Sequence, residues 1–174
     1  MQLLTSKTKV SEILQVAIGY NESEFNVYIR EAQDFDLKPM LCEDFYFELV
    51  ANMEDAGDWQ KVVDGGEYQF EGKDMFFRGI SDVLAYFTYA RFILKCNYVS
   101  TTHGFTIKKT NFSDPLPLEE KRNMYYKYKK DANIIFADVK KFIERNIDTY
   151  ASWDSCNEGC NTPKATGFKT RVIK

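Results

Sequence analysis

The chain has 174 residues, of which 44% are hydrophobic and 16% aromatic, a composition that suits one domain with a sizeable buried core and excludes wholesale disorder. No uncharged apolar run approaches the roughly 18 residues that span a bilayer, and the N-terminal segment MQLLTSKTKVSEILQ lacks the continuous apolar stretch of a secretory signal. We therefore expect a soluble, intracellular protein with no membrane contact.

The net charge of −3 hides an uneven distribution along the chain. Fifteen acidic residues stand against three basic ones between Glu12 and Glu71, whereas eighteen basic residues stand against eleven acidic ones between Gly72 and Lys174. Either the two parts face each other within one fold, or the acidic face of one copy meets the basic face of the next, as heterologous packing in a ring allows. The sequence leaves both interpretations open.

The N-terminal segment predicts a short amphipathic helix followed by a second one. Thr5 or Ser6 can cap the first helix over residues 8–17, because a hydroxyl oxygen accepts a hydrogen bond from a free backbone N–H of the first turn. Glycine and asparagine then end this helix, and Ser23 is the expected cap of the second, in which apolar residues recur three and four positions apart.

Pro39 lies inside the apolar pattern of the second helix. Proline within a helix loses a hydrogen bond and clashes with the preceding turn, so we predict a kink or short break at residues 37–39 and another helix to about residue 52. Four glycines and short β-prone pieces in residues 55–73 predict a loop that holds a small hairpin. The Gly-Gly pair in this loop lacks the GK[ST] sequence of a phosphate-binding loop.

The segment from Asp74 to Asn97, DMFFRGISDVLAYFTYARFILKCN, is apolar on nearly every side when it is placed on a helix. A helix that is apolar all round in a globular protein lies in the middle of a bundle. Asp82 is placed to pair with Arg78 one turn earlier, and Arg91 should reach a carboxylate elsewhere in the bundle. We therefore interpret these charges as structural pairs rather than as catalytic groups.

A second long helix is predicted from Leu118 to Ile147, where the positions of its apolar stripe are interrupted only by Lys121. Several lysines lie mostly off this stripe and form a basic face. Between the two long helices, residues 98–114 alternate like strands. The C-terminal segment 155–174 has no helical period but holds apolar residues among basic ones, as in an extended arm that becomes ordered against a partner.

These elements predict a mainly α fold, an elongated bundle of four to five helices with a small β-like hairpin loop. The predicted organisation is one helical domain, residues 1–154, followed by the extended C-terminal arm, residues 155–174. Helices of this length in so short a chain indicate an elongated bundle, and nothing in that bundle resembles an active site, which favours a role in assembly over catalysis.

The four cysteines are candidates for metal ligands or cross-links. Cys42 and Cys96 lie in apolar helical patterns, where a small buried thiol is the expected state. Cys156 and Cys160 form the sequence CNEGC, which supplies half of a zinc site, and the remaining ligands are missing. Whether this pair binds a metal or forms a disulfide stays open, although we expect neither a metal nor a cofactor.

No motif of an enzyme is present in the sequence. His103, the only histidine, lies next to a glycine in a loop, where a turn residue is expected more often than a general base. The motifs HExxH and CxxC and the glycine-rich nucleotide motifs are absent. We therefore expect that the protein is not an enzyme.

The order of segments resembles the ring-forming head–tail connector proteins of tailed bacteriophages, also called head-completion or adaptor proteins. The resemblance covers most of residues 22–153 and rests on order and spacing rather than on an invariant motif. Ring proteins of crAss-like phages are one lineage in which the glycine-rich loop and the basic C-terminal segment would be additions. The matching segments are YIREAQDFDLKPMLCEDFYFELV, MFFRGISDVLAYFTYARFI, THGFTIKK and the closing helix that ends in RNIDTYASW.

This resemblance implies a virion protein at the head–tail junction, assembled in the host cytoplasm as a dodecameric ring. Its expected partners are further copies of itself, the portal protein, a tail or second ring protein, and viral DNA that passes through the channel without sequence specificity. In such rings the loop between the long helices faces the channel, and terminal extensions contact neighbours. The residues expected at the channel are His103, Lys108 and Lys109, and those expected at the subunit or portal interface are Lys164, Phe168, Lys169, Arg171 and Ile173.

Two other functions stay open. One is a nucleic-acid-binding helical module that uses the basic face of the last long helix. The other is an enzyme that depends on His103. The lysines of the first alternative are Lys127, Lys129, Lys130, Lys140 and Lys141.

Overall fold

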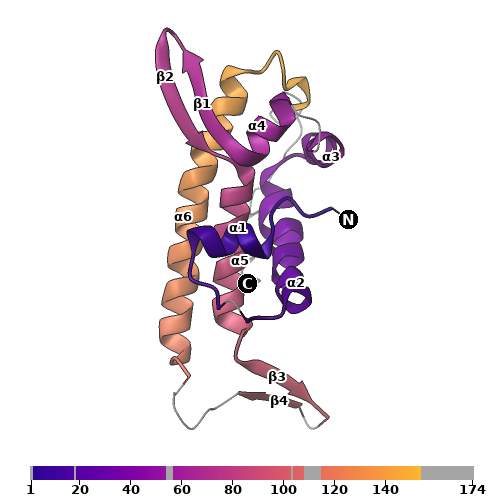
Figure 1. The fold of residues 1–174 in the computed structure, drawn as a ribbon, viewed down its shortest axis with the longest axis vertical. Helices are drawn as coiled ribbons and strands as arrows, with labels where there is room; N and C mark the ends of the chain where they lie inside the picture. The colour runs from indigo at the N-terminus through magenta and orange to yellow at the C-terminus, as the bar shows by residue number, and fades with distance from the viewer. Residues whose placement is uncertain (1, 18, 54–56, 103, 108–114, 154–174) are drawn as a thin grey trace, which may run out of the picture.

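The computed structural model describes every residue except 1, 18, 54–56, 103, 108–114 and 154–174. The molecule is elongated, and two long helices, α5 (Ile80–Lys95) and α6 (Leu118–Arg145), run side by side along it (Figure 1). A two-stranded antiparallel hairpin lies at each end of this pair. The expectation of a mainly α-helical chain is confirmed, although the described residues form six α-helices and two hairpins.

Three shorter helices pack against α5, namely α1 (Lys7–Ile13), α2 (Glu22–Ala32) and α4 (Asp58–Asp64). A fourth, α3 (Glu43–Asn52), packs against α4 and the turns η2 (Lys38–Met40) and η3 (Ala151–Trp153). Ser6 caps α1 as predicted, because its Oγ accepts a hydrogen bond of 3.2 Å from the backbone N–H of Lys9. The helix ends at Ile13 and not at Ala17 as predicted. The cap of α2 is Asn21, whose Oδ1 accepts from the backbone N–H of Ser23, so the prediction of a Ser23 cap is wrong.

The predicted break near Pro39 is confirmed. A π-helical turn, η1 (Gln33–Leu37), continues α2 and is followed by a 3-10 turn, η2 (Lys38–Met40). Pro39 has no backbone N–H and cannot donate the next helical hydrogen bond, and the wider π-helical turn before it accommodates this loss. The π-turn buries Asp36 and leaves the neighbouring Phe35 67% exposed.

The prediction of one helix from Asp74 to Asn97 is wrong in its first part. Residues Lys73–Arg78 form strand β2, which pairs with β1 (Gly65–Phe70), and α5 begins only at Ile80. Burial alternates along β2, as in a strand: Phe77 is buried and Phe76 is 69% exposed. In the sequence, three adjacent apolar residues fit the two-residue period of a strand and the 3.6-residue period of a helix equally well.

Glycine permits the junction between β2 and α5. A Cβ added to Gly79 would lie 2.1 Å from the carbonyl oxygen of Val63, closer than any side chain can approach backbone. The strands of this hairpin are joined by Glu71 and Gly72, which both have positive φ (51° and 74°), as two-residue hairpin turns require. The predicted loop over residues 55–73 therefore holds the helix α4 and the strand β1, with Val62 and Val63 buried.

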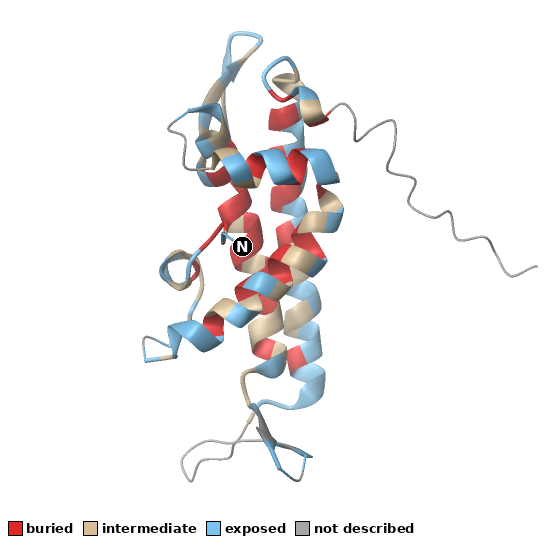
Figure 2. Cartoon of the chain, turned by 90° about the vertical axis from the view of Figure 1, so that its right-hand side faces the viewer, coloured by how far each residue is buried: buried red, intermediate tan, exposed pale blue. Residues whose placement is uncertain are grey.

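Buried residues fill the middle of the molecule, and exposed residues cover the hairpin tips (Figure 2). An aromatic cluster closes the core beneath β1–β2. In this cluster Phe77 stacks on Phe142 of α6 with ring centroids 4.1 Å apart and an interplanar angle of 13°. Trp153, in the short 3-10 turn η3 (Ala151–Trp153), is buried against Phe45 of α3. The cluster thus joins the C-terminal end of the described chain to the N-terminal helices.

The two predicted buried thiols have different states. Cys96 is free, and burial raises the pKa of its thiol. Cys42 is disulfide-bonded, so the prediction of a free thiol at this position is wrong. Cys156, Cys160 and the whole predicted arm 155–174 lie outside the described residues.

Candidate assembly surfaces

The segment predicted to alternate like strands forms the second hairpin, β3 (Tyr98–Thr101) and β4 (Gly104–Ile107). It projects beyond the ends of α5 and α6 (Figure 1). The exposed side chains of its described residues are uncharged. The predicted channel residues His103, Lys108 and Lys109 lie outside the described residues, as do the predicted interface residues Lys164, Phe168, Lys169, Arg171 and Ile173.

Lys121, which interrupts the apolar stripe of α6, lies at the base of this hairpin. It is only 4% exposed, and its Nζ lies 5.5 Å from the ring centroid of Tyr98 at the start of β3. A cation over an aromatic face is stabilising, more so where water is excluded. Burial raises the pKa of the nearby Cys96 thiol, and the Lys121 charge opposes this effect. Lys121, the one polar residue in the apolar stripe of α6, therefore forms a contact between α6 and the hairpin.

The predicted carboxylate partner of Arg91 is Asp36 on the π-turn η1. Arg91 Nε donates to Asp36 Oδ2 at 2.5 Å, and Lys129 Nζ of α6 donates to Asp36 Oδ1 at 3.2 Å. The Asp36 side chain is only 3% exposed, so two cations and two hydrogen bonds compensate a buried charge. Burial lowers the pKa of Lys129, but the hydrogen bond and charge of Asp36 outweigh burial and raise it. This cluster joins three elements and leaves no unpaired group for catalysis.

The predicted pair between Arg78 and Asp82 is also present, with Nε 2.7 Å from Oδ2. Other lysines of α6 are paired as well: Lys140 lies 3.5 Å from Glu144, and Lys141 lies 2.9 Å from Asp138. Exposed pairs of this kind contribute little to stability. They do reduce the positive charge that the basic face of α6 presents to a partner.

The outward face of α6 combines apolar and basic side chains. Tyr126, Lys130 and Ile134 follow one another at intervals of four residues and therefore lie on one line along the helix. Tyr126 is 66% and Ile134 57% exposed. Lys127 beside this line is exposed too, whereas Asp131 is half-buried. Of the predicted basic face, Lys127, Lys130, Lys140 and Lys141 are exposed, whereas Lys129 is half-buried and pairs with Asp36. The exposed apolar groups Tyr126 and Ile134 were not predicted.

The outward face of α3 has the opposite charge and was missed from sequence. Asp44, Phe47, Glu48 and Ala51 are all exposed and share one side of the helix. Phe47 is 53% exposed, and Lys38 Nζ lies 4.9 Å from its ring centroid. The helix contains no basic residue. In Figure 1, α6 forms one side of the molecule and α3 lies at the other, with α4 and α5 between them.

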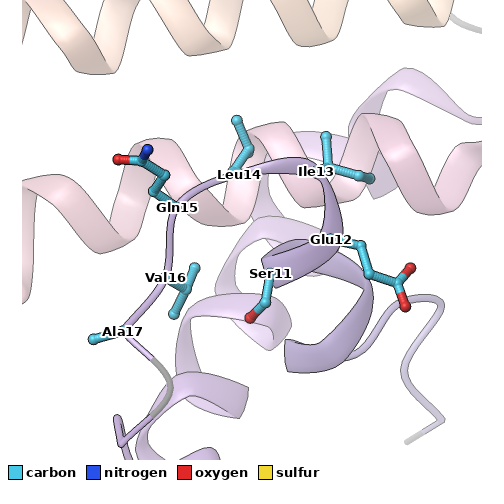
Figure 3. A pocket seen from close by; sticks show the side chains of 7 residues that line it. All are labelled: Ser11, Glu12, Ile13, Leu14, Gln15, Val16 and Ala17. Atoms are coloured by element: carbon cyan, nitrogen blue, oxygen red, sulfur yellow. The ribbon is translucent and has the colours of Figure 1, made fainter.

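The hollow at the end of α1 holds few groups that could carry chemistry. It has a volume of about 480 Å³ and is lined by residues 11–17, the end of α1 and the chain after it (Figure 3). Glu12 is the single titratable side chain in its wall, and the Ser11 hydroxyl donates to the carbonyl oxygen of Lys7. Among the described residues no three histidine, cysteine or carboxylate side chains gather as metal ligands. None of the helices described is both long and apolar enough to cross a membrane.

Comparisons with curated proteins and with solved structures give no match. A family match covers residues 37–163, from the π-turn η1 to beyond η3, and includes the two hairpins, α5 and α6. It leaves out α1 and α2. Because the match spans well over half of the chain, the protein belongs to the family described as a family of unknown function, DUF6712.

Proposed function

We propose that the protein is a structural virion protein, a subunit of a homo-oligomeric ring that joins the portal to the tail of a tailed bacteriophage and forms part of the DNA channel. The observation that carries this proposal is the β3–β4 hairpin, which projects from the end of the α5–α6 pair. The resemblance to head–tail connectors gives this position to the segment that faces the channel.

The chemistry of the hairpin suits a passage through which DNA slides. Thr101, Thr102 and Thr106 are exposed and uncharged. Each phosphate contact by a cation adds salt-dependent affinity for DNA, so a dense basic surface would slow the passage of a duplex. Lys108 and Lys109 follow the hairpin in the sequence and supply limited positive charge in the same segment.

The rest of the molecule supports a mechanical role. The aromatic cluster and the Asp36 cluster join α5 and α6 to the shorter helices, so the hairpin is carried by a rigid body. The copies would form a dodecameric ring between portal and tail, located at the head–tail junction, with the segment 155–174 as an arm that contacts a neighbour or the portal. No catalytic step is part of this function.

Assembly with the portal protein of the same phage tests the proposal. We expect a ring-shaped complex by negative-stain imaging and native mass spectrometry. A chain that stays monomeric and does not bind the portal would contradict it. Deletion of residues 162–174 should weaken assembly at unchanged helical content, and His103→Ala should leave assembly nearly intact.

Introducing positive charge in the hairpin tests whether it contacts DNA in the channel or only supports the architecture of the ring. Thr102→Lys together with Thr106→Lys should leave the ring intact but slow DNA release from particles, because every copy adds two phosphate contacts. The matched control carries Gln at both positions and should release DNA at the normal rate. The rival function, a nucleic-acid-binding module, predicts instead that the wild-type monomer binds duplex DNA at low salt through α6.

A further inference from the structure

The outward faces of α3 and α6 match each other in charge, length and apolar content. On α6, the line begins at Tyr126, passes Lys130 and ends at Ile134, eight residues or about 12 Å further along, and Lys127 lies beside it. On α3, Asp44 and Glu48 flank Phe47 on a helix of 10 residues, about 15 Å long. Acidic side chains of α3 flank Phe47, and Lys38 of η2 also lies over its ring. Basic side chains accompany the apolar groups on α6, so the two helices present opposite charges.

We propose that these two faces form the contact between neighbouring copies: the outward face of α6, defined by Tyr126, Lys130 and Ile134, packs against the outward face of α3, defined by Asp44, Phe47 and Glu48, of the next copy. This inference rests on the proposed ring and specifies its interface.

A second copy is the occupant that the molecule itself indicates. One chain carries both halves of the contact, and the helices that bear them, α6 and α3, lie on opposite sides of the body in Figure 1. A contact between unlike faces is heterologous, so each copy leaves its other face free for another neighbour, and the series closes into a ring when the rotation permits. A partner of another kind would match one face and leave the other without an explanation.

The apolar groups supply attraction, and the charges supply orientation. Phe47, Tyr126 and Ile134 expose more than half of their surface in the single chain. Burial of aromatic side chains dominates the energy of most interfaces, and a surrounding rim of opposite charges excludes wrong alignments. A contact of α6 with a second α6, or of α3 with a second α3, would place like charges together and is disfavoured.

Charge reversal on each face tests the pairing. Lys130→Glu and Glu48→Lys should each lower ring formation at least about tenfold, because like charges then face each other. In an equimolar mixture the two variants should form rings again. There the glutamate introduced on α6 of one copy meets the lysine introduced on α3 of the other, while the second contact of each copy has wild-type charges. The double variant should also assemble. Control reversals on the exposed face of the β1–β2 hairpin, Glu67→Lys and Lys73→Glu, should have no effect.

The readout is native mass spectrometry with and without the portal protein, accompanied by circular dichroism to verify helical content. Zero-length carbodiimide cross-linking of a mixture of ¹⁴N- and ¹⁵N-labelled chains should join Lys127 or Lys130 to Asp44 or Glu48 of another copy. Rings that tolerate both single reversals, or single variants that the mixture does not rescue, would overturn this interface and leave the proposed ring standing. A wild-type chain that stays monomeric under all these conditions would overturn both.

Discussion

The two β-hairpins differ in what they contact, although each is a two-stranded antiparallel ribbon. The β1–β2 hairpin lies against α6: Phe77 stacks on Phe142, and Arg145 donates to the Tyr68 hydroxyl at 2.6 Å. The β3–β4 hairpin extends beyond the helices, and at its base Lys121 Nζ of α6 lies over the ring of Tyr98.

An isolated two-stranded hairpin is at most marginally stable in water, so packing decides its role. The first hairpin is part of the hydrophobic core and should unfold with it. The side chains of the second hairpin whose burial the structure describes are exposed and available for a surface function. Substitutions in the two ribbons should therefore have very different effects on stability.

The largest effect is expected for Phe77→Ala. Removing a buried aromatic ring from the cluster around Phe142 should lower the free energy of unfolding by about 3–5 kcal/mol, measured by urea denaturation. Phe76→Ala is the matched control, since the neighbouring ring in the same strand is 69% exposed and its loss should cost less than about 1 kcal/mol. Equal effects of the two substitutions would show that β1–β2 does not belong to the core.

A second test concerns the junction that holds β1–β2 against α5. Gly79→Ala places a Cβ 2.1 Å from the Val63 carbonyl oxygen, so the backbone must move, and we expect a loss of at least about 2 kcal/mol. Gly19→Ala is the control, because no atom lies within 4 Å of the added Cβ there. Its free energy of unfolding should change by less than about 1 kcal/mol. Differential scanning calorimetry would distinguish the two, and an unchanged melting temperature for Gly79→Ala would contradict the close approach.

The sequence predicted elements with a long period or a strong local signal and failed where an apolar run was short. The last long helix was predictable because its periodicity extends over many turns: it begins at Leu118 as expected and ends at Arg145, two residues before the predicted end at Ile147. The start of α5 was placed six residues too early, because the run Met75–Phe77 is too short to reveal its period and the helix that follows is apolar on all sides. The break after α2 was predictable because proline acts locally.

The candidate surfaces were predictable only in part. The lysines that lie off the apolar stripe predicted exposed basic positions on α6, and all of these but Lys129, which pairs with Asp36, are exposed. The acidic face of α3 was missed because Phe47 fits the apolar spacing of a core residue in sequence, and only the packing of Phe45, Tyr46 and Leu49 leaves it outside. Asp36 was likewise hidden, since the π-turn that buries it shifts the register of the helix by one residue.

Alkaline pH should weaken the end of the molecule that carries β1–β2. The Tyr150 hydroxyl donates to the carbonyl oxygen of Asp58 at 2.8 Å, and burial raises the pKa of Tyr150. The unfolded chain ionises tyrosine near pH 10, so above that pH the folded state binds more protons than the unfolded one. The stabilisation is fully present below pH 10 and is lost as the pH rises further.

Urea denaturation at pH 9 and pH 11 measures this loss. We expect the wild type to lose about 1 kcal/mol through Tyr150 alone between these values. Tyr150→Phe should be less stable by about 1 kcal/mol at pH 9, because the Asp58 carbonyl loses its donor, but should lose less on going to pH 11. An identical pH dependence in both proteins would show that Tyr150 is not shielded from solvent.

The smallest effect is expected in the projecting hairpin. Thr101 Oγ1 donates to the Gly104 carbonyl oxygen at 2.8 Å, across the end of β3–β4 and in contact with water. Because the Thr101 side chain is exposed and water can replace this bond, Thr101→Ala should change the free energy of unfolding by less than about 0.5 kcal/mol. A loss above about 1 kcal/mol in urea denaturation would mean that the hairpin unfolds together with the core. In that case β3–β4 would be part of the rigid body, and its exposed threonines could not be regarded as a surface free to adapt to DNA.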